Sequence, residues 1–386
     1  MKDASILSKT HQQRYQAIPL IYAAPGRVNL IGEHTDYAEG FVMPAAIDYA
    51  TLAAISPRSD GKVVLYAENY GEERTFDAAD LPAHNSGDGH WSNYPLGVLS
   101  ILASEGHTIP AFSLTLWGDV PNSAGLSSSA SVEVATMSAV AALLGIQIPG
   151  PKLARLCQRV ENEFVGANSG IMDQFISANG KADNALLLDC RYLTYELAPI
   201  PHSIALVIAN TMVKHSVAGG EYTERRAQVE EAAGIISLHR PEVKFLRDAT
   251  VEDLAKWGHE IPPVSLKRAR HVITENDRTV AAAKALKDHD LKTLGRLMHE
   301  AHISYSKDFE ASCYEADLMV DLAQDLPGLI GARLTGGGFG GCTINLVEQE
   351  HAETFAASLK KRYDDATGKD AQVFICHASD GVHKVA

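Results

Sequence analysis

The chain has 386 residues, of which 46% are hydrophobic, so it is long and apolar enough to bury a large core and to form two domains. It carries 34 basic and 48 acidic residues, a formal net charge of −14, and no basic tract interrupts this acidic excess. Nucleic acid and anionic membranes are therefore excluded as expected partners, and a phosphorylated ligand would need backbone N–H groups, a few placed cations or a metal ion.

The amino-terminal segment, MKDASILSKTHQQRYQ, is polar and lacks the apolar stretch of a signal peptide. No apolar run in the chain approaches the roughly 18 residues of a membrane span. We therefore expect a cytoplasmic protein. Five cysteines lie far apart without a C-x-x-C pair, so the sequence predicts neither a disulfide framework nor a zinc site.

The first part of the chain is predicted to be rich in strands. Runs of branched or alternating apolar residues, closed by Gly, Pro and Asp, occur at 23–32, 50–58, 61–68 and 112–121. Helical periodicity follows at 128–146 and 150–166. In the second of these helices Leu153, Leu156, Val160 and Phe164 share one face, which must pack on the predicted sheet.

The second part is predicted to mix helices and strands. Two strand-like runs are expected within 184–210, followed by a charged helical region over about 220–325. The end reads as a strand at 329–335, a glycine cluster, a strand at 342–347, a helix at 351–366 and a strand at 371–378. This order predicts an α+β fold. We place two domains at residues 1–203 and 204–386.

The segment DVPNSAGLSSSASVEVA, residues 119–135, has the physical properties of an anion site. A Pro/Gly/Ser loop leads into a helix, whose amino terminus offers unpaired N–H groups and the positive end of the macrodipole. No lysine occurs between Gly118 and Glu133, so the P-loop pattern is absent and Mg²⁺ would have to neutralise charge. Ser129 and a remote carboxylate are suitable ligands. A plain serine-rich helix cap is the alternative.

The segment LTGGGFGG, residues 334–341, formally contains G-x-G-x-x-G. A β-type run, CTINLV, follows it where a dinucleotide-binding fold requires a helix, so the Rossmann interpretation is excluded. Glycines so closely spaced indicate a backbone that is approached closely or driven to positive φ. A flexible hairpin turn explains this stretch equally well.

Two further stretches carry candidate catalytic groups. GRVNLIGEHTDY, residues 26–37, packs ionisable residues just after a strand, and GANSGIMDQF, residues 166–175, carries Asp173 beside apolar neighbours. A carboxylate in apolar surroundings needs a partner or a chemical task. On the residues alone, a polar turn and a capping aspartate remain the alternatives.

Together these stretches resemble the GHMP kinase superfamily, and GRVNLIGEHTDY looks like the signature of its galactokinase branch. PNSAGLSSSAS resembles the phosphate loop and LTGGGFGG the third motif of the superfamily, while GIMDQF, LLLDCR and GEYTERR look like further galactokinase segments in the expected order. The resemblance implies an amino-terminal domain like the second domain of ribosomal protein S5, a ferredoxin-like carboxy-terminal domain, and an active site in the cleft between them.

The implied reaction transfers the γ-phosphoryl group of ATP to the C1 hydroxyl of α-D-galactose, giving galactose 1-phosphate and ADP, a step of galactose metabolism. Asp173 would face the C1 hydroxyl as general base or as electrostatic positioner, and Arg27 would stabilise the transferred phosphoryl group or tune Asp173. A guanidinium beside Asp173 would lower the pKa of that carboxyl and make it a weaker base.

The resemblance also implies the ligand contacts. The galactose site would comprise Arg27, Glu33, His34, Asp36, Gly170, Asp173 and Tyr222. ATP would contact Trp91 near its adenine, the loop residues Ser123, Ala124, Gly125, Leu126, Ser127, Ser128 and Ser129, and the glycines Gly337 and Gly338. Mg²⁺ would be held by Ser129 and Glu161, with Ser128 as the alternative hydroxyl. We expect a monomer whose partners are the small molecules galactose and ATP.

Two alternatives stay open at this point. An N-acetylgalactosamine kinase is compatible with the same motifs, whereas the EHTDY stretch argues against mevalonate and homoserine kinases. A non-catalytic galactose sensor is the alternative of a different class. The intact GLSSSAS loop, together with Arg27, Glu161 and Asp173, argues against it.

Overall fold

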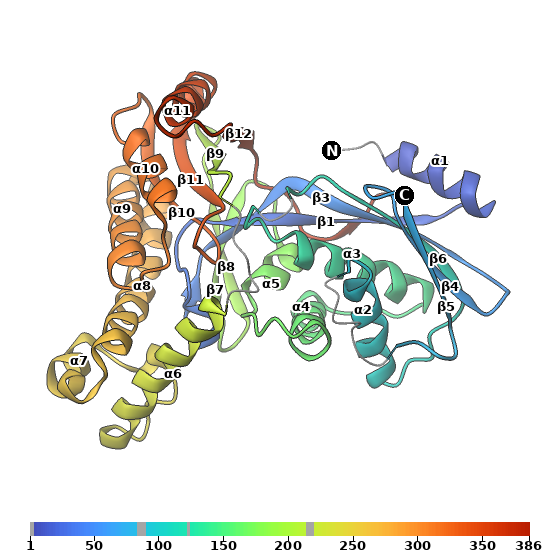
Figure 1. The fold of residues 1–386 in the computed structure, drawn as a ribbon, viewed down its shortest axis with the longest axis horizontal. Helices are drawn as coiled ribbons and strands as arrows, with labels where there is room; N and C mark the ends of the chain where they lie inside the picture. Colours follow the sequence, from blue (N-terminus) through green and yellow to red (C-terminus); the bar gives the residue numbers. More distant parts are fainter. Residues whose placement is uncertain (1–3, 83–89, 122–123, 214–219) are drawn as a thin grey trace.

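Two bodies of structure lie side by side in the computed structural model, which describes residues 4–82, 90–121, 124–213 and 220–386 (Figure 1). The first contains a six-stranded sheet in the order β13-β1-β3-β6-β4-β5. Its strands are β1 (Leu20–Asn29), β3 (Pro44–Pro57), β4 (Lys62–Ala67), β5 (Glu72–Asp77), β6 (Phe112–Gly118) and β13 (His383–Lys384). The helices around it are α1 (Ala4–Tyr15), α2 (Asn93–Ser104), α3 (Ser128–Leu143), α4 (Gly150–Arg159) and α5 (Met172–Asn179).

The sheet is covered on both faces because its side chains alternate. Leu52 and Ala54 of β3 pack with Leu7 of α1, whereas Ala53 and Ile55 of the same strand pack against the layer formed by α2, α3 and α4. Both sets are buried, which is why β3 is apolar almost throughout. The predicted helical face at 150–166 is buried in the same layer, although its last turn, η2 (Val160–Val165), is π-helical.

Residues 184–210 contain more strands than the sequence analysis expected. The structure has three strands there, β7 (Asn184–Asp189), β8 (Thr194–Pro199) and β9 (Ile204–Asn210), where the sequence analysis expected two. The missed break is a tight turn in which the Asp189 side chain accepts the N–H groups of Arg191 and Tyr192, and Leu193 takes a φ of 54°. Strands β7 and β8 form a small sheet with β2 (Phe41–Val42) in the order β2-β7-β8.

The second body is built on an antiparallel sheet in the order β10-β11-β9-β12. Its other strands are β10 (Leu329–Leu334), β11 (Cys342–Glu348) and β12 (Gln372–Cys376). The helices are α6 (Glu221–His239), α7 (Val251–Trp257), α8 (Pro263–Lys287), α9 (Leu291–Lys307), α10 (Tyr314–Ala323) and α11 (Ala352–Thr367). Counted along the chain from β9, the strands lie in the order second, third, first, fourth, which is the ferredoxin-like arrangement that the resemblance implied.

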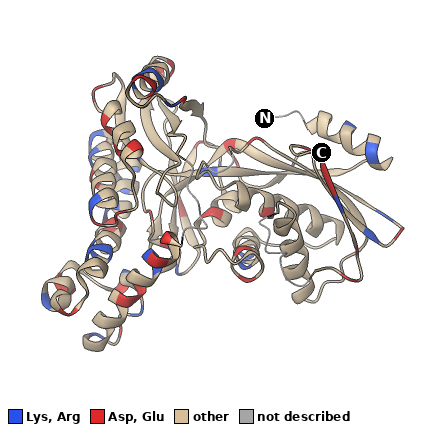
Figure 2. Ribbon diagram, viewed as in Figure 1, with Lys and Arg blue, Asp and Glu red and all other residues tan. Residues whose placement is uncertain are grey.

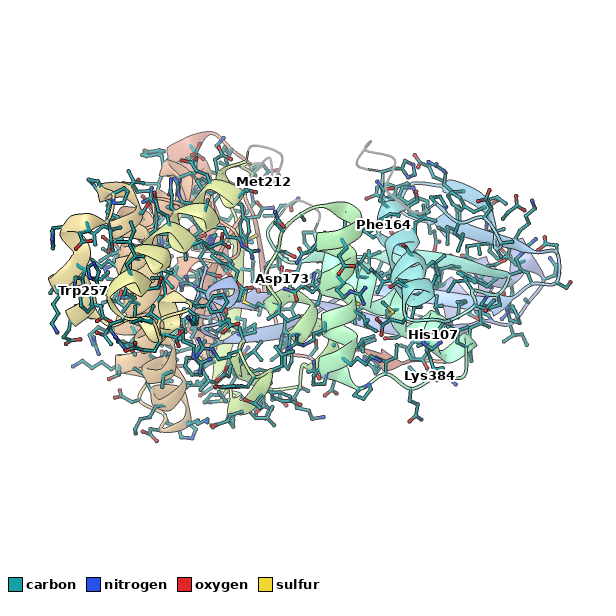
Figure 3. The ribbon with its side chains drawn as sticks, turned by 90° about the horizontal axis from the view of Figure 1, so that it is seen from below. His107, Phe164, Asp173, Met212, Trp257 and Lys384 are labelled. Atoms are coloured by element: carbon teal, nitrogen blue, oxygen red, sulfur yellow. The ribbon has the colours of Figure 1, made fainter. Side chains whose placement is uncertain are left out.

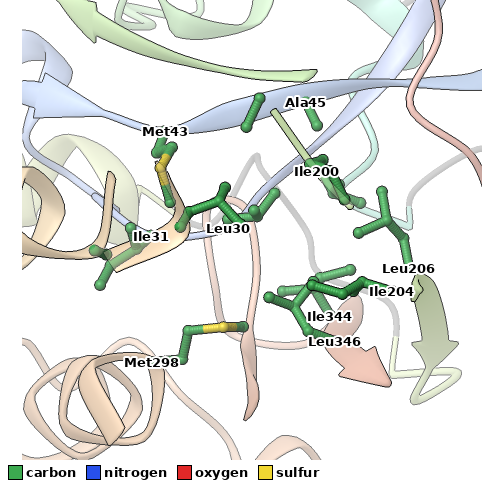
Figure 4. Packing of buried hydrophobic residues seen from close by; sticks show 14 of the residues in the cluster. Leu30, Ile31, Met43, Ala45, Ile200, Ile204, Leu206, Met298, Ile344 and Leu346 are labelled. Carbon is green, nitrogen blue, oxygen red and sulfur yellow. The ribbon is translucent and has the colours of Figure 1, made fainter. Parts of the chain in front are cut away.

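One hydrophobic cluster joins the two bodies (Figure 4). Leu30 and Ile31, directly after β1, pack with Leu206 of β9, Met298 of α9 and Ile344 of β11. A shared core of this kind fixes how the two bodies sit relative to each other. The division at residue 203 stays a prediction, and β13, which follows that point, pairs with β1.

Charge is distributed over the outside of the molecule. Figure 2 shows acidic and basic residues interspersed along the helices of the second body, with most of the central sheet uncharged. Among the described residues, no helix combines the length and the apolarity that crossing a membrane requires. Four of the five cysteines are buried, Cys313 is partly exposed, and all five are free thiols.

Candidate functional site

A pocket lies where the two bodies meet, and Figure 3 labels Asp173 at this junction. Most of the residues selected from the sequence line it, namely Arg27, Glu33, His34, Asp36, Gly125, Leu126, Ser127, Ser128, Ser129, Glu161, Gly170, Asp173, Tyr222, Gly337 and Gly338. Segments far apart in the sequence therefore converge on one cavity. Ala124 is fully buried behind it, and Ser123 lies outside the described residues.

Arg27 and Asp173 form a two-pronged ion pair in the pocket. The Arg27 Nε donates to Asp173 Oδ1 at 2.8 Å and its Nη2 donates to Oδ2 at 2.7 Å. The hydroxyl of Ser127 donates to the same Oδ2 at 2.5 Å. Arg27 is only 4% exposed, so this pairing is shielded from water on the arginine side. Three donors thus fix the orientation of the Asp173 carboxylate.

Arg27 also holds the serine-rich loop. Its Nη1 donates to the Gly125 carbonyl at 2.5 Å and its backbone N–H donates to the Leu126 carbonyl at 3.0 Å. Ser127 precedes α3 with a φ of 62°, and the helix begins at Ser128. Ser128 and Ser129 line the pocket, and the first N–H groups of α3 have no intrahelical acceptors, as an anion site requires.

The glycine cluster packs against this loop backbone to backbone. A Cβ at Gly336 would lie 2.9 Å from the Gly125 carbonyl oxygen, and one at Gly341 would lie 3.1 Å from the Ala124 carbonyl oxygen. Both glycines have positive φ, 85° and 79°. Close approach and positive φ, the two reasons predicted for these glycines, therefore both apply, and the cluster is not simply a flexible hairpin turn.

Glu33 is held in a buried network that the sequence analysis did not foresee. The Arg333 Nη1 and the Gly336 N–H donate to its Oε1 at 3.1 and 2.9 Å, and Asn29 Nδ2 donates to its Oε2 at 2.9 Å. Arg333 also lies 3.9 Å from a carboxylate oxygen of Glu275 on α8. Burial raises the pKa of Glu33, against the lowering effect of Arg333 and Arg27.

His34 sits in an aromatic cage with both ring nitrogens engaged. Its Nε2 lies 3.2 Å from the Gly337 carbonyl oxygen and 3.0 Å from the Tyr305 hydroxyl, and its Nδ1 lies 3.0 Å from the Tyr37 hydroxyl. A carbonyl can only accept, so Nε2 carries the proton and Nδ1 accepts from Tyr37. Burial lowers the pKa of His34 to about 3, which keeps the ring neutral.

Asp36 lies beside Gly170, and its donors among the described residues are backbone N–H groups. The N–H groups of Tyr37 and Met172 donate to its two oxygens at 3.0 and 3.3 Å. A Cβ at Gly170 would overlap Asp36 Oδ2 at 1.7 Å, so only glycine fits there. Burial, and secondarily the charge of Asp173, raise the pKa of Asp36 to about 6.

Glu161 lines the pocket from the π-helical turn. Its Oε2 accepts from Ser169 Oγ at 2.5 Å and from Gln174 Nε2 at 3.0 Å. Among the described residues no donor reaches its Oε1. Ser129, in the first turn of α3, lines the same pocket and offers a hydroxyl oxygen. One carboxylate and one hydroxyl form an all-oxygen donor set of the kind that Mg²⁺ prefers.

Trp91 lies in an adjoining hollow and not in the main pocket. Tyr70, Trp117 and Val132 line this hollow with it, and Ser128 and Ser129 line both spaces. The Trp91 Nε1 donates to Glu72 at 2.9 Å. Its expected place near an adenine stays a prediction, and the position next to the serine loop is compatible with it.

Several residues at the site escaped the sequence analysis. Arg333 could have been noticed, because a charged residue in the apolar strand GARL must find a buried partner. Gln174 follows Asp173 in the segment GIMDQF, but the sequence analysis assigned no role to it. Tyr94 lines both hollows but gave no signal, since an aromatic residue in a helix is usually core.

Three family models match the amino-acid sequence. They are the galactokinase galactose-binding signature over residues 9–57, the GHMP kinases N terminal domain over 93–181 and the GHMP kinases C terminal model over 282–365. The first covers the stretch with Glu33, His34 and Asp36, and the second covers the serine loop and Asp173.

Full-length relatives agree with these matches. A galactokinase of Roseiflexus sp. (strain RS-1) is 44% identical over 386 residues, covering 100% of this chain and 98% of that protein. A galactokinase of Fusobacterium nucleatum is 40% identical over 369 residues, covering 94% of each.

The solved structures agree as well. The crystal structure of Lactococcus lactis galactokinase complexed with galactose aligns with a TM-score of 0.94 at 34% identity, covering 99% of this chain and 100% of that one. A mevalonate kinase, at 20% identity and a TM-score of 0.66, shares the fold only. The expected two-domain fold of mixed helix and sheet is confirmed.

Proposed function

The chain belongs to the galactokinase family of GHMP kinases and is an ATP-dependent sugar kinase that transfers the γ-phosphoryl group of ATP to galactose, and from this premise we propose the part that each residue plays. The observation that carries the proposal is the single pocket lined by the EHTDY turn, the serine loop and the Arg27–Asp173 pair. Acceptor sugar, phosphoryl donor and a fixed carboxylate can meet there.

Asp173 is the proposed catalytic carboxylate. A carboxylate has roughly four acceptor positions, and three are taken by Arg27 and Ser127. About one position is left for the C1 hydroxyl of the sugar, so that oxygen is held in one orientation. Asp173 either takes the hydroxyl proton as phosphoryl transfer proceeds or orients the hydroxyl, and Arg27 adds positive charge beside the transferred group.

We propose Asp36 as the main residue that recognises the sugar hydroxyls. Within the described part of the chain its carboxylate accepts two backbone N–H groups, and it lines the pocket next to Gly170. Glu33 and His34 contribute less directly to sugar recognition. Most of their hydrogen-bonding capacity is used by Arg333, Gly336, Tyr37 and Gly337. A sugar with an inverted hydroxyl would leave such buried groups unpaired, which supports discrimination against glucose.

The serine loop is the proposed phosphate site, and Mg²⁺ the proposed divalent ion. The amino terminus of α3 supplies N–H groups and the macrodipole, and the glycines at 337 and 338 let the phosphates approach the opposite backbone. Ser129 and Glu161 would hold the ion, which fits their all-oxygen donor set. When bound, the ion neutralises charge on the transferred phosphoryl group.

The test is ADP release from Mg·ATP with galactose, N-acetylgalactosamine, glucose or no sugar, measured side by side. Turnover is expected with galactose and to be at most a small fraction of that rate with glucose. Preference for N-acetylgalactosamine would move the chain to that branch of the family. Galactose binding without ADP release would favour a sensor.

A monomer is the proposed working unit. Sedimentation at micromolar concentration checks this, and a dimer there would contradict it. The expected cytoplasmic location of the protein stays a prediction.

A further inference from the structure

Gln174 is a buried amide that joins two acidic side chains. Its Nε2 donates to Glu161 Oε2 at 3.0 Å and to Glu133 Oε2 at 3.3 Å, and the whole residue is inaccessible to solvent. Turning the amide over would direct its carbonyl oxygen at both carboxyl groups. Glu161, whose Oε2 also accepts from Ser169, therefore determines which way the amide points.

The helix that carries Gln174 also carries Asp173. Both lie in the first turn of α5, and consecutive helical side chains point about 100° apart. Asp173 contacts Arg27 and Ser127, while Gln174 contacts Glu161. One short helix thus positions the proposed catalytic carboxylate and the neighbour of the proposed metal ligand together.

Glu133 anchors the other side of the amide. It lies one helical turn after Ser129 on α3 and is fully buried. Among the described residues, no cation pairs with it and no donor reaches its Oε1. Burial, followed by the nearby charge of Glu161, raises the pKa of Glu133 well above its usual value. Its recorded hydrogen bond is the one from Gln174.

These contacts divide the two oxygens of Glu161. Oε2 is occupied by Ser169 and Gln174, and Oε1 is left without a donor from the described residues on a carboxylate that lines the pocket. When a carboxylate that binds the ion is held through one of its oxygens, its second oxygen points in a fixed direction. Groups that hold a metal ligand in this way commonly affect metal affinity by 10- to 100-fold.

We propose that Gln174, anchored by Glu133, is a positioning residue that holds Glu161 so that its free oxygen serves the divalent ion bound with ATP. Ser169 shares this task from the rim of the pocket. The inference rests on the proposed function, since it takes Glu161 as a ligand of the ion. It adds residues outside the sugar turn, the serine loop and the glycine cluster.

The test compares Gln174→Met, which keeps the volume and removes the donor, with the wild-type chain. Mn²⁺ binding in the presence of a non-hydrolysable ATP analogue is followed by the electron paramagnetic resonance signal of free Mn²⁺. We expect Gln174→Met to weaken Mn²⁺ binding about 10- to 100-fold, with galactose affinity unchanged. High Mg²⁺ should then restore much of the turnover, which a general loss of structure would not allow.

Thr136→Val is the matched control. Thr136 is equally buried on α3, three residues after Glu133, and its hydroxyl has no recorded partner. The Thr136→Val variant should bind Mn²⁺ like the wild type. If Gln174→Met does not fold, Ser169→Ala removes the other donor to the same oxygen at a half-buried position and should weaken Mn²⁺ binding about tenfold.

Mn²⁺ affinity within twofold of wild type in the folded variant would overturn the inference. The same experiment separates this failure from that of the proposed function. Should the wild type release no ADP with galactose while its Mn²⁺ affinity still depends on Gln174, the proposed function falls and the positioning role stands.

Discussion

The carboxylates of the site differ mainly in their partners. Asp173 has an arginine and a hydroxyl, Asp36 has two backbone N–H groups, and Glu133 has one amide N–H. Partners of different strength adapt one functional group to different tasks. Asp173 is therefore suited to keep one fixed orientation beside a phosphoryl group, and Asp36 to bind hydroxyl groups.

Asp173→Asn is expected to lower kcat with galactose by about 10²- to 10⁴-fold, because the amide has nearly the same shape but cannot take a proton or pair with Arg27. Galactose affinity, measured by calorimetry, should stay within several-fold. Asp80→Asn, in the exposed turn after β5, is the control and should be fully active. Near-wild-type kcat in Asp173→Asn would remove Asp173 from the chemistry.

Galactose affinity is expected to fall at acid pH because of Asp36. With a pKa raised to about 6, this carboxyl is ionised at pH 7.5 and mostly protonated at pH 5, where binding should be about tenfold weaker. Calorimetric titration at both pH values measures this. Asp36→Asn should bind galactose weakly with little pH dependence, and an unchanged slope in that variant would assign the titration to another group.

Folding responds to Asp36 in the opposite direction. Because its folded pKa is raised, its contribution to stability is fully present below the unfolded pKa and is lost as pH rises through about 6. Acid should therefore weaken galactose binding while the protonation of Asp36 adds to the stability of the fold.

Sequence motifs were sufficient to select most of the pocket residues, because residues such as Arg27, Glu33 and Asp173 stand out as charges beside apolar strands and helices. They could not reveal the pairing among them. That Ser127 binds Asp173, or that Arg333 holds Glu33 across 300 positions, depends on how the two bodies pack.

Glycine has two different functions in the cluster after β10. Gly336 needs its positive φ and its closeness to Gly125, whereas a Cβ at Gly337 would meet only Tyr222 Cδ2, at 4.0 Å. Gly337 has no positive φ, so its backbone would accept a side chain. Its missing side chain leaves room in the pocket.

Gly337→Ala is therefore expected to fold like the wild type and to weaken substrate binding, since the methyl group enters the pocket. Gly336→Ala should instead lower the free energy of unfolding by at least about 1 kcal/mol, because both φ and the contact with Gly125 are unfavourable. Thermal unfolding and KM for galactose and ATP, measured for both variants, distinguish the two effects. Equal behaviour of the two would contradict this division.

Elements with strong periodicity were predictable, and those that depend on tertiary contacts were not. Helix α1 went unpredicted, because only Leu7 and His11 are buried and most of the other residues are polar. The break between β7 and β8 was missed because Asp189 and Leu193 make a turn without Gly or Pro. The π-helical form of Val160–Val165 continues an ordinary helical pattern, so no sequence signal marks it.

A buried charge network ties the two bodies together behind the pocket. Arg333 of β10 contacts Glu33 after β1, and Glu275 of α8 accepts the Gly32 N–H at 2.9 Å. Arg333, Glu33 and Glu275 are all at most 1% exposed, so no water can replace a missing partner. The EHTDY turn is thereby fixed to both bodies at once.

Arg333→Met should lower the free energy of unfolding by about 3–5 kcal/mol, since it leaves the buried Glu33 carboxylate without the arginine that contacts it, whereas Glu275 keeps its ion pair with Arg278. Urea unfolding at pH 7.5 measures the loss. Arg296→Met, which breaks an exposed ion pair with Glu300, is the control and should cost far less. A loss below about 1 kcal/mol for Arg333→Met would show that the network contributes little.

The pairing of β13 with β1 also has a consequence for biosynthesis. Tyr22 and Ala23 pair with Lys384 and His383, so the edge of the first sheet is formed by residues that leave the ribosome more than 350 positions later. Until then, one edge of β1 has no partner strand, and an open edge invites association with other nascent chains. Ribosome-bound chains that stop before residue 383 should therefore depend more on chaperones than chains in which the sheet is complete.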